Sequence, residues 1–163
     1  MTDRKILRLV LSSLLVCLVI CFIFSNSLQN GEESSRYSGM VTRLLRSIFD
    51  PHGTTDEETF HYFVRKGAHF SEFALLGFSL WLLMQSIRSK YCVSCPGSML
   101  FAALAAAVTD EFIQSFTGRT SSVTDVLIDF GGALTGFVLP LVLFAIIKQS
   151  KEKNHAAKEC GIE

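Results

Sequence analysis

The chain has 163 residues, a hydrophobic composition of 49% and a mean hydropathy of +0.38. This length allows one domain, and so apolar a composition is typical of a membrane protein rather than of a soluble domain. Fifteen Lys and Arg residues balance fifteen Asp and Glu residues without forming a basic block, which excludes a nucleic-acid binder.

Four apolar segments approach the roughly 20 residues that a helix needs to cross a bilayer core. They cover residues 6–28, 67–87, 97–116 and 126–147. We therefore predict an all-α, polytopic membrane protein, in which residues 6–147 form a bundle of four transmembrane helices between an N-terminal segment at 1–5 and a charged tail at 148–163. A signal peptide is the alternative for the first segment. Since no small-x-small cleavage site follows it, a retained helix is favoured.

The distribution of lysine and arginine predicts the orientation of the bundle, because these residues are retained preferentially on the cytoplasmic side. Nine of them lie before or at the start of the first span, between the second and third, or after the fourth, and six lie in or beside the other two loops. The prediction is a multi-pass protein of the cell membrane with both termini in the cytoplasm and two loops outside.

The first outer loop, residues 29–65, is too long to be a simple connector. Apolar residues recur in it at helical spacing, namely Met40, Val41, Leu44, Leu45, Ile48 and Phe49. This pattern predicts a short interfacial helix on the outer membrane surface, with packing on the bundle as an equal alternative. Thr55 and Glu58 then form a capping-box pattern, so the second transmembrane helix is expected to begin outside, near Asp56.

Cys92 and Cys95 form a CxxC pair in the short loop between the second and third spans. Without a second pair or a nearby histidine, this spacing favours ordinary reduced thiols over a zinc half-site or a redox motif.

The polar residues of the four spans all fall at the outer end of the bundle when the helices alternate in direction. They are Ser25, Asn26, Ser27 and Gln29 of the first span, Arg65, Lys66, His69 and Glu72 of the second, Asp110, Glu111 and Gln114 of the third, and Asp125 and Asp129 of the fourth. Spacings of three or four residues place each set on one face of its helix, so the faces are expected to meet inside the bundle. Charged groups within a span are costly and usually mark a functional site.

A purely structural ion-pair network is the alternative interpretation of this cluster. In such a network, Arg65, Lys66 and Arg119 would neutralise Glu72, Glu111 and Asp129. A functional site is favoured, because apolar packing and the small residues of the last span can hold a bundle of this size without buried charges.

Three ordered blocks carry a more specific pattern. They are Arg65-Lys66-Gly67-Ala68-His69-Phe70-Ser71-Glu72-Phe73, then Thr109-Asp110-Glu111-x-x-Gln114-x-Phe116-x-Gly118-Arg119, and then Asp125-x-x-x-Asp129-x-x-Gly132-Ala133-x-x-Gly136. Over residues 6–147 the chain resembles the VanZ-like family of bacterial membrane proteins, departing from it at Thr117, where many members have Pro, and at Asp129, where a number have Asn. The resemblance implies a small multi-span envelope protein, mostly of Gram-positive bacteria, in a family named after a member associated with teicoplanin resistance.

Three functions are open at this stage. The first is binding of an anionic lipid or a lipid-linked cell-wall precursor, with a contribution to glycopeptide (teicoplanin) tolerance, by Arg65, Lys66, Gln114, Arg119 and Asp125. The second is a membrane-embedded hydrolase or transferase, metal-assisted or acid–base, whose candidate catalytic residues are His69, Glu72, Asp110, Glu111 and Asp129. No nucleophile or metal-ligand spacing is evident, so no metal ligand and no cofactor is assigned. The third, a small ion-coupled transporter, is disfavoured because the inner halves of the spans lack a polar path.

Overall fold

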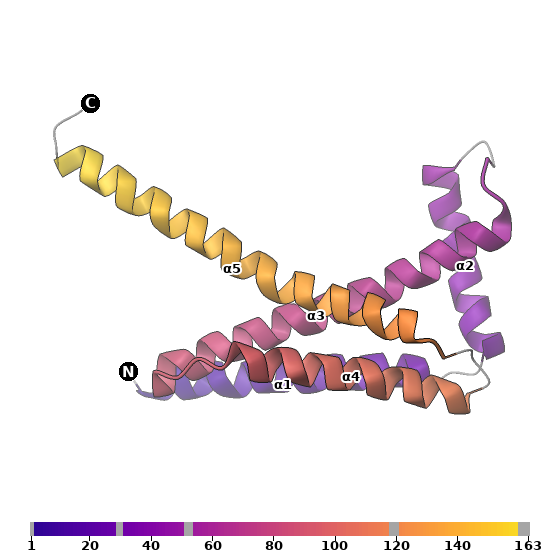
Figure 1. Cartoon of the computed structure of the whole chain (residues 1–163), viewed down its shortest axis with the longest axis horizontal. Helices are drawn as coiled ribbons and strands as arrows, with labels where there is room; N and C mark the ends of the chain where they lie inside the picture. The colour runs from indigo at the N-terminus through magenta and orange to yellow at the C-terminus, as the bar shows by residue number, and fades with distance from the viewer. Residues whose placement is uncertain (1, 29–30, 51–53, 118–120, 160–163) are drawn as a thin grey trace.

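The computed structural model describes residues 2–28, 31–50, 54–117 and 121–159, with side chains left out at 2, 31–38, 40 and 151–159. This part of the chain folds into five helices, α1 (Thr2–Ser27), α2 (Gly31–Phe49), α3 (Glu57–Tyr91), α4 (Pro96–Phe116) and α5 (Val123–Glu159) (Figure 1). Four of them, α1, α3, α4 and α5, are long and apolar enough to cross a membrane. The predicted all-α architecture with four spanning helices is confirmed.

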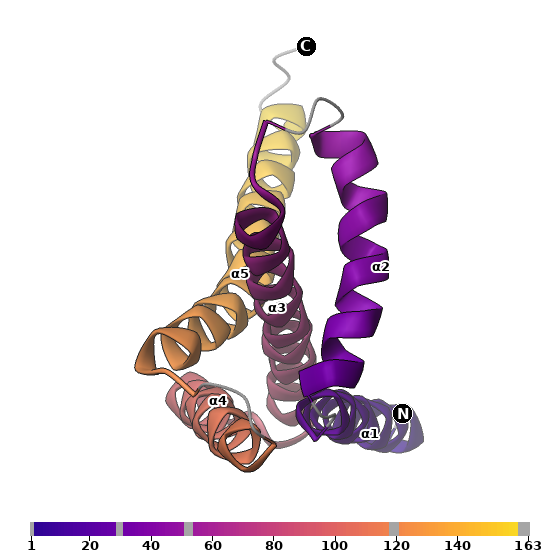
Figure 2. The same ribbon diagram turned by 90° about the vertical axis from the view of Figure 1, so that its right-hand side faces the viewer.

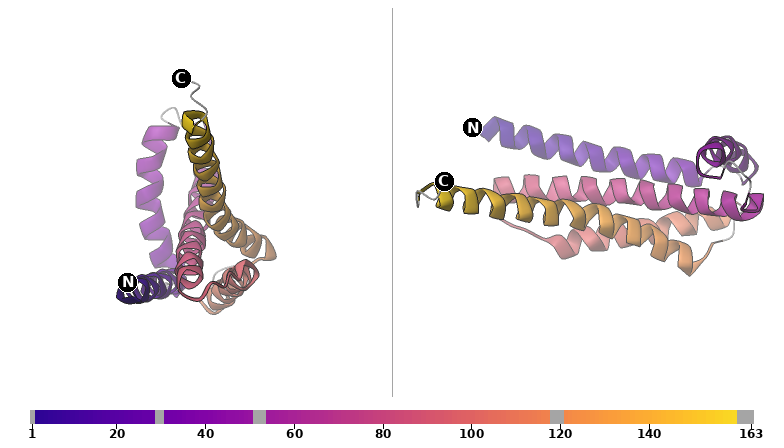
Figure 3. Two further views of the ribbon diagram at one scale, coloured as in Figure 1. Left: turned by 90° about the vertical axis from the view of Figure 1, so that its left-hand side faces the viewer. Right: turned by 90° about the horizontal axis from the view of Figure 1, so that it is seen from above.

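Helix α3 lies at the centre of the bundle and packs against each of the other four helices, most extensively against α5 and α1. Its residues Phe73, Leu76 and Leu80 are buried between Ile23 of α1 and Phe137 of α5. Successive spanning helices run in opposite directions, so α1 begins and α5 ends at the same side (Figures 1 and 3). At the other side, α1 and α4 end and α3 and α5 begin. We call this side the polar end.

Glycines allow α3 and α5 to approach until their backbones touch. A Cβ atom on Gly136 would lie 1.9 Å from the carbonyl oxygen of Ala74, and one on Gly132 would lie 2.3 Å from that of Phe70. On the facing helix, a Cβ atom on Gly77 would lie 1.9 Å from the carbonyl oxygen of Ala133. The four-residue spacing of Gly132 and Gly136 is the small-xxx-small pattern of close helix pairs in membranes.

The ends of the spanning helices differ in places from the predicted ones. Helix α3 begins near Asp56 as predicted, but the capping residue is Asp56 rather than Thr55, because the Asp56 carboxylate accepts a hydrogen bond from the Thr59 amide. With 35 residues it is about 52 Å long and extends beyond a hydrocarbon core of about 30 Å. Helix α5 continues to Glu159, through most of the predicted tail, because Lys, Glu, Gln and Ala are good helix formers.

Helix α2 lies crosswise to α1 and α3 at the polar end (Figures 1 and 2). Its apolar residues Leu44, Ile48 and Phe49 are exposed. Its residues Val41 and Leu45 line an open apolar groove shared with Phe60 and Phe63 of α3. The element predicted in the first loop is therefore present as a crosswise helix, and its exposed apolar face suits a membrane surface.

Asp50 ties the end of α2 to the start of α3. Its buried carboxylate accepts hydrogen bonds from the amides of Thr54 and Thr55 at 2.8 and 2.9 Å and from the Thr54 hydroxyl at 2.7 Å. Arg46 donates to the Thr55 carbonyl oxygen at 2.7 Å. The Thr55 amide, helped by Thr54 and Arg46, lowers the pKa of Asp50 from the ordinary 3.8 to about 2.

We expect Asp50→Ala to loosen this connection, and acid to do the same in the wild type. Because the folded pKa lies below the unfolded one, the carboxylate stabilises the turn fully above about pH 4, and this contribution is lost as the pH falls through about 2. Amide hydrogen exchange at Thr54 and Thr55, corrected for intrinsic rates, measures both effects. Equal protection in wild type and variant near neutral pH would show that the turn does not depend on Asp50.

Candidate functional site

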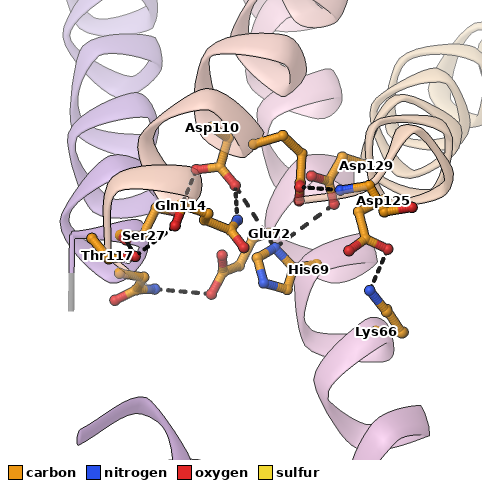
Figure 4. A network of polar contacts seen from close by, with 12 residues as sticks. Ser27, Lys66, His69, Glu72, Asp110, Gln114, Thr117, Asp125 and Asp129 are labelled. Carbon is orange, nitrogen blue, oxygen red and sulfur yellow. Dashed lines mark hydrogen bonds and ion pairs between the residues drawn. The ribbon is translucent and has the colours of Figure 1, made fainter. Parts of the chain in front are cut away.

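Side chains from all four spanning helices converge at the polar end (Figure 4). Helix α3 contributes Lys66, His69 and Glu72 from one face, because residues three apart lie on the same side of a helix. The other helices contribute Asn26 and Ser27 of α1, Asp110, Glu111 and Gln114 of α4, and Asp125 and Asp129 of α5. We call these ten residues the polar cluster.

Asp110 of α4 is the most connected member of the polar cluster. It is fully buried, at 0% exposure, and its carboxylate accepts hydrogen bonds from the Ser27 hydroxyl at 2.5 Å and from the Gln114 amide at 2.6 Å. Thr117 adds a bond from its hydroxyl to the Ser27 carbonyl oxygen at 3.4 Å. These bonds hold the end of α1 against the end of α4 and fix the direction of the Asp110 carboxylate.

His69 lies between two buried carboxylates. Its Nδ1 atom is 3.9 Å from Asp110 Oδ2 and 3.7 Å from Asp129 Oδ1 (Figure 4). Asp129 is 1% exposed, and neither of its carboxylate oxygens accepts a hydrogen bond from the described residues. His69, Asp110 and Asp129 each offer one ligand atom, and these atoms lie within 4.8 Å of one another. Among the described residues, these three form a group whose spacing is compatible with one metal ion.

The pairing of charges differs from the structural network considered from the sequence. Lys66 forms an ion pair with Asp125, a partner that the network did not contain. Glu72 accepts a hydrogen bond from the Asn26 amide at 2.9 Å, and Glu111 accepts one from the Ser122 backbone amide at 3.1 Å. Neutral donors therefore contribute to holding the polar cluster, beside the ion pair of Lys66 with Asp125.

The remaining predicted site residues are the two arginines. Arg65 lines a narrow hollow together with Lys66, His69, Glu111 and Asp129, and this hollow is too tight to hold a water molecule as it stands. Its buried Nε atom has no hydrogen-bond partner among the described residues, which leaves this donor available to an oxyanion. Arg119 lies outside the described residues.

Asn26, Ser27 and Ser122 hold site residues in place, although none of them was assigned to the site from the sequence. Asn26 and Ser27 were placed at the correct end of the first span, and the run of polar residues Ser25, Asn26, Ser27 and Gln29 is the signal that points to them. Ser122 acts through its backbone amide, which no side-chain pattern reveals.

A comparison with protein families finds one match. A family model described as VanZ/LLP1 matches residues 12–145, well over half of the chain and all four spanning helices in large part. None of the curated proteins and none of the solved structures compared with the chain matches it.

Proposed function

The chain belongs to the VanZ/LLP1 family, and from this membership and the polar cluster we propose that it binds an anionic group of a cell-envelope component at the outer face of the membrane. The observation that carries the proposal is the convergence of side chains from four spanning helices on one buried cluster. Polar and ionisable groups are expensive within a span, so their concentration at one end favours a binding function over a purely structural one.

The cations of the polar end support an anionic ligand. Arg65 has a buried Nε donor that no described residue uses, and Lys66 lines the same hollow. Arginine binds phosphate and carboxylate oxygens through two parallel hydrogen bonds, which gives direction as well as affinity. A lipid phosphate or the phosphate of a lipid-linked cell-wall precursor has the required charge and reaches this depth from the outer leaflet.

The orientation in this proposal comes from the charges that flank the spans. Nine lysine and arginine residues belong to the side where α1 begins and α5 ends, against six on the side of the polar end. Since the cytoplasmic side retains such residues preferentially, the polar end is assigned to the outer face and both termini to the cytoplasm. Helix α2, with its exposed apolar face, then rests on the outer surface of the cell membrane.

We extend the proposal to tolerance of the glycopeptide teicoplanin, which acts at the outer face of the cell envelope. In a sensitive Gram-positive host, the wild-type protein is expected to raise the inhibitory concentration of teicoplanin, and Glu111→Gln and Arg119→Ala are expected to return it to the level of an empty vector. Glutamine keeps the acceptor for the Ser122 amide, so Glu111→Gln removes charge without removing the local hydrogen bond.

Two matched variants serve as controls, with every variant compared at an equal amount of protein in the membrane. Glu58→Gln makes the same change at an exposed position at the start of α3, and Arg43→Ala removes an exposed arginine of α2. Both are expected to behave as wild type. If the wild type gives no tolerance, teicoplanin is removed from the proposal. If Glu58→Gln and Glu111→Gln lose tolerance equally, the polar cluster is not the site responsible for teicoplanin tolerance.

A further inference from the structure

We propose that His69, Asp110 and Asp129 together bind one divalent transition-metal ion. The three residues come from α3, α4 and α5, so the site exists only in the assembled bundle. This inference goes beyond the proposed function, since it concerns an ion held by the protein itself rather than the envelope component that the protein recognises.

The separations between the three side chains suit ligands of a shared ion. The distances from His69 Nδ1 to the two carboxylate oxygens, 3.7 and 3.9 Å, exceed the 2.7 to 3.2 Å of ordinary hydrogen bonds. Ligand atoms about 2.0 to 2.2 Å from a tetrahedral zinc ion lie roughly 3.3 to 3.6 Å apart. The two distances from His69 are a few tenths of an ångström longer than this, and the two carboxylates, whose ligand oxygens lie within 4.8 Å of each other, would approach by up to about 1.5 Å to surround an ion.

Asp129 supplies a second observation that points to a cation. A carboxylate that is 1% exposed normally accepts hydrogen bonds, because burying an unsatisfied charge is costly. Neither of its oxygens accepts one from the described residues, and His69 Nδ1, at 3.7 Å, is too far for a hydrogen bond. A metal ion in contact with Asp129 provides the missing compensation.

The surroundings of Asp110 match those of a metal ligand. Carboxylates that bind metals are usually oriented by hydrogen bonds from outer residues, and Ser27 and Gln114 supply such bonds to Asp110. The positions of His69 and Asp129 are fixed by the close contact of α3 and α5, because Phe70 and Gly132 touch beside them. All three ligands thus lie on rigid helices rather than on loops.

The charge of the polar cluster also favours a cation. It contains five carboxylates, those of Glu72, Asp110, Glu111, Asp125 and Asp129, and Lys66 forms an ion pair with one of them, Asp125. A divalent ion at the centre of the cluster offsets the negative charge of these carboxylates and adds to the attraction of phosphate. The ion would therefore act with Arg65 on the anionic group, and this role, unlike the site itself, rests on the proposed function.

One nitrogen and two carboxylate oxygens favour Zn²⁺ or Mn²⁺. Imidazole suits zinc and other transition metals, and carboxylates suit manganese and magnesium. Three protein ligands also leave a coordination position open, as in catalytic zinc sites. A buried site with a histidine ligand is less suited to Mg²⁺, which keeps several waters and prefers oxygen.

The test is metal binding by the full-length protein, purified without a histidine tag, stripped with a chelator and titrated with Zn²⁺, Mn²⁺ or Mg²⁺. We expect one Zn²⁺ or Mn²⁺ ion per chain by elemental analysis and calorimetry. Asp129→Asn is expected to weaken binding by about 10- to 100-fold or more, since changes of outer residues alone have effects of that size. His69→Leu is expected to abolish stoichiometric binding.

Asp125→Asn is the matched control, because it removes the same charge one turn away on the same helix and leaves the three ligands in place. Its metal affinity is expected to stay near that of the wild type, and size-exclusion profiles confirm that each variant is folded. Absence of stoichiometric binding to the wild type overturns the proposal and leaves His69 as a simple charge partner of two carboxylates. Equal weakening by Asp125→Asn and Asp129→Asn overturns the three-ligand site in favour of diffuse attraction by the acidic groups.

A second measurement, capture of a lipid-linked phosphate by the purified protein with and without metal, separates this inference from the proposed function. If the wild-type protein binds one ion but does not capture a lipid-linked phosphate, the metal site is supported and the proposed ligand is wrong. If the wild-type protein still captures the phosphate after complete removal of metal, the proposed function is supported and the ion has no part in phosphate binding.

Discussion

Alanine at Gly136 is expected to destabilise the bundle, whereas alanine at Gly131 on the same helix is expected to be tolerated. The new Cβ atom at Gly136 would lie 1.9 Å from the backbone oxygen of Ala74, which can move only if α3 and α5 separate. At Gly131, the nearest atom is the ring of Phe70 at 4.0 Å, an ordinary contact. Gly132→Ala, with its Cβ atom 2.3 Å from the Phe70 carbonyl oxygen, is expected to behave like Gly136→Ala.

The sign of the change in stability distinguishes an effect on helix packing from an effect on helix propensity. An alanine in place of a helical glycine gains up to about 1 kcal/mol of helix stability, so Gly131→Ala is expected to be neutral or slightly more stable. Overpacking costs typically about 1 to 3 kcal/mol and occasionally more, and a clash with backbone atoms belongs at the upper end. Gly132→Ala and Gly136→Ala are therefore expected to lower the melting temperature of the detergent-solubilised protein and its abundance in membranes.

This set of variants also tests whether the helix contact positions the site. Separation of α3 from α5 lengthens the distance between His69 and Asp129, now 3.7 Å, and should reduce function in any Gly136→Ala protein that still folds. If all three alanine variants melt together with the wild type, the two helices are not held as closely as the structure has them, and the geometry of His69 and Asp129 loses its support.

The sequence predicts the fold and the location of the polar cluster because both depend on one-dimensional patterns. Apolar runs of sufficient length define the four spans, and the alternating direction of successive spans brings Lys66, Glu111 and Asp125 to the same end. Neither of these predictions requires knowing how each helix is rotated about its own axis. The crosswise helix α2 is also predicted, because its apolar residues recur with helical period.

The individual partners in the cluster could not be predicted, since they depend on that rotation and on the tilt between helices. In the alternative, purely structural network Lys66 would neutralise Glu72, Glu111 or Asp129, but the close approach of α3 and α5 places it against Asp125. The group formed by His69, Asp110 and Asp129 draws one residue from each of three helices, so no spacing within a single segment identifies it. The cap of α3 was missed for a simpler reason, because Thr55 and Asp56 are both good capping residues and the sequence does not rank them.

Replacement of Asp110 is expected to have a large effect that depends on the replacing residue. Asp110→Ala removes the acceptor of both the Ser27 hydroxyl and the Gln114 amide in a fully buried position. Each buried polar group left unsatisfied costs about 1 to 3 kcal/mol, so the loss for the two is about 2 kcal/mol or more, before the cavity is counted. Because these bonds join α1 to α4, we expect Asp110→Ala to melt at a markedly lower temperature and to be scarce in membranes.

Asp110→Asn is the informative companion, because it removes the negative charge as alanine does but keeps the shape and a hydrogen-bonding group. The Ser27 hydroxyl can rotate to donate or accept, and the Gln114 amide offers both a donor and an acceptor, so both can rebind asparagine. We expect Asp110→Asn to reach wild-type abundance and yet to lose function, and to bind metal more weakly. The difference in stability between the two variants isolates the hydrogen bonds from the charge.

Each possible result of this pair bears on a different part of the structure. Equal stability of Asp110→Ala and Asp110→Asn would mean that the bonds from Ser27 and Gln114 do not hold α1 against α4. An Asp110→Asn protein with full function would mean that the carboxylate charge is not needed, and the polar end would then be a scaffold of hydrogen bonds around Arg65 alone. A folded, inactive Asp110→Asn protein beside a poorly folded Asp110→Ala protein is the result expected of a residue that both joins two helices and serves the site they enclose.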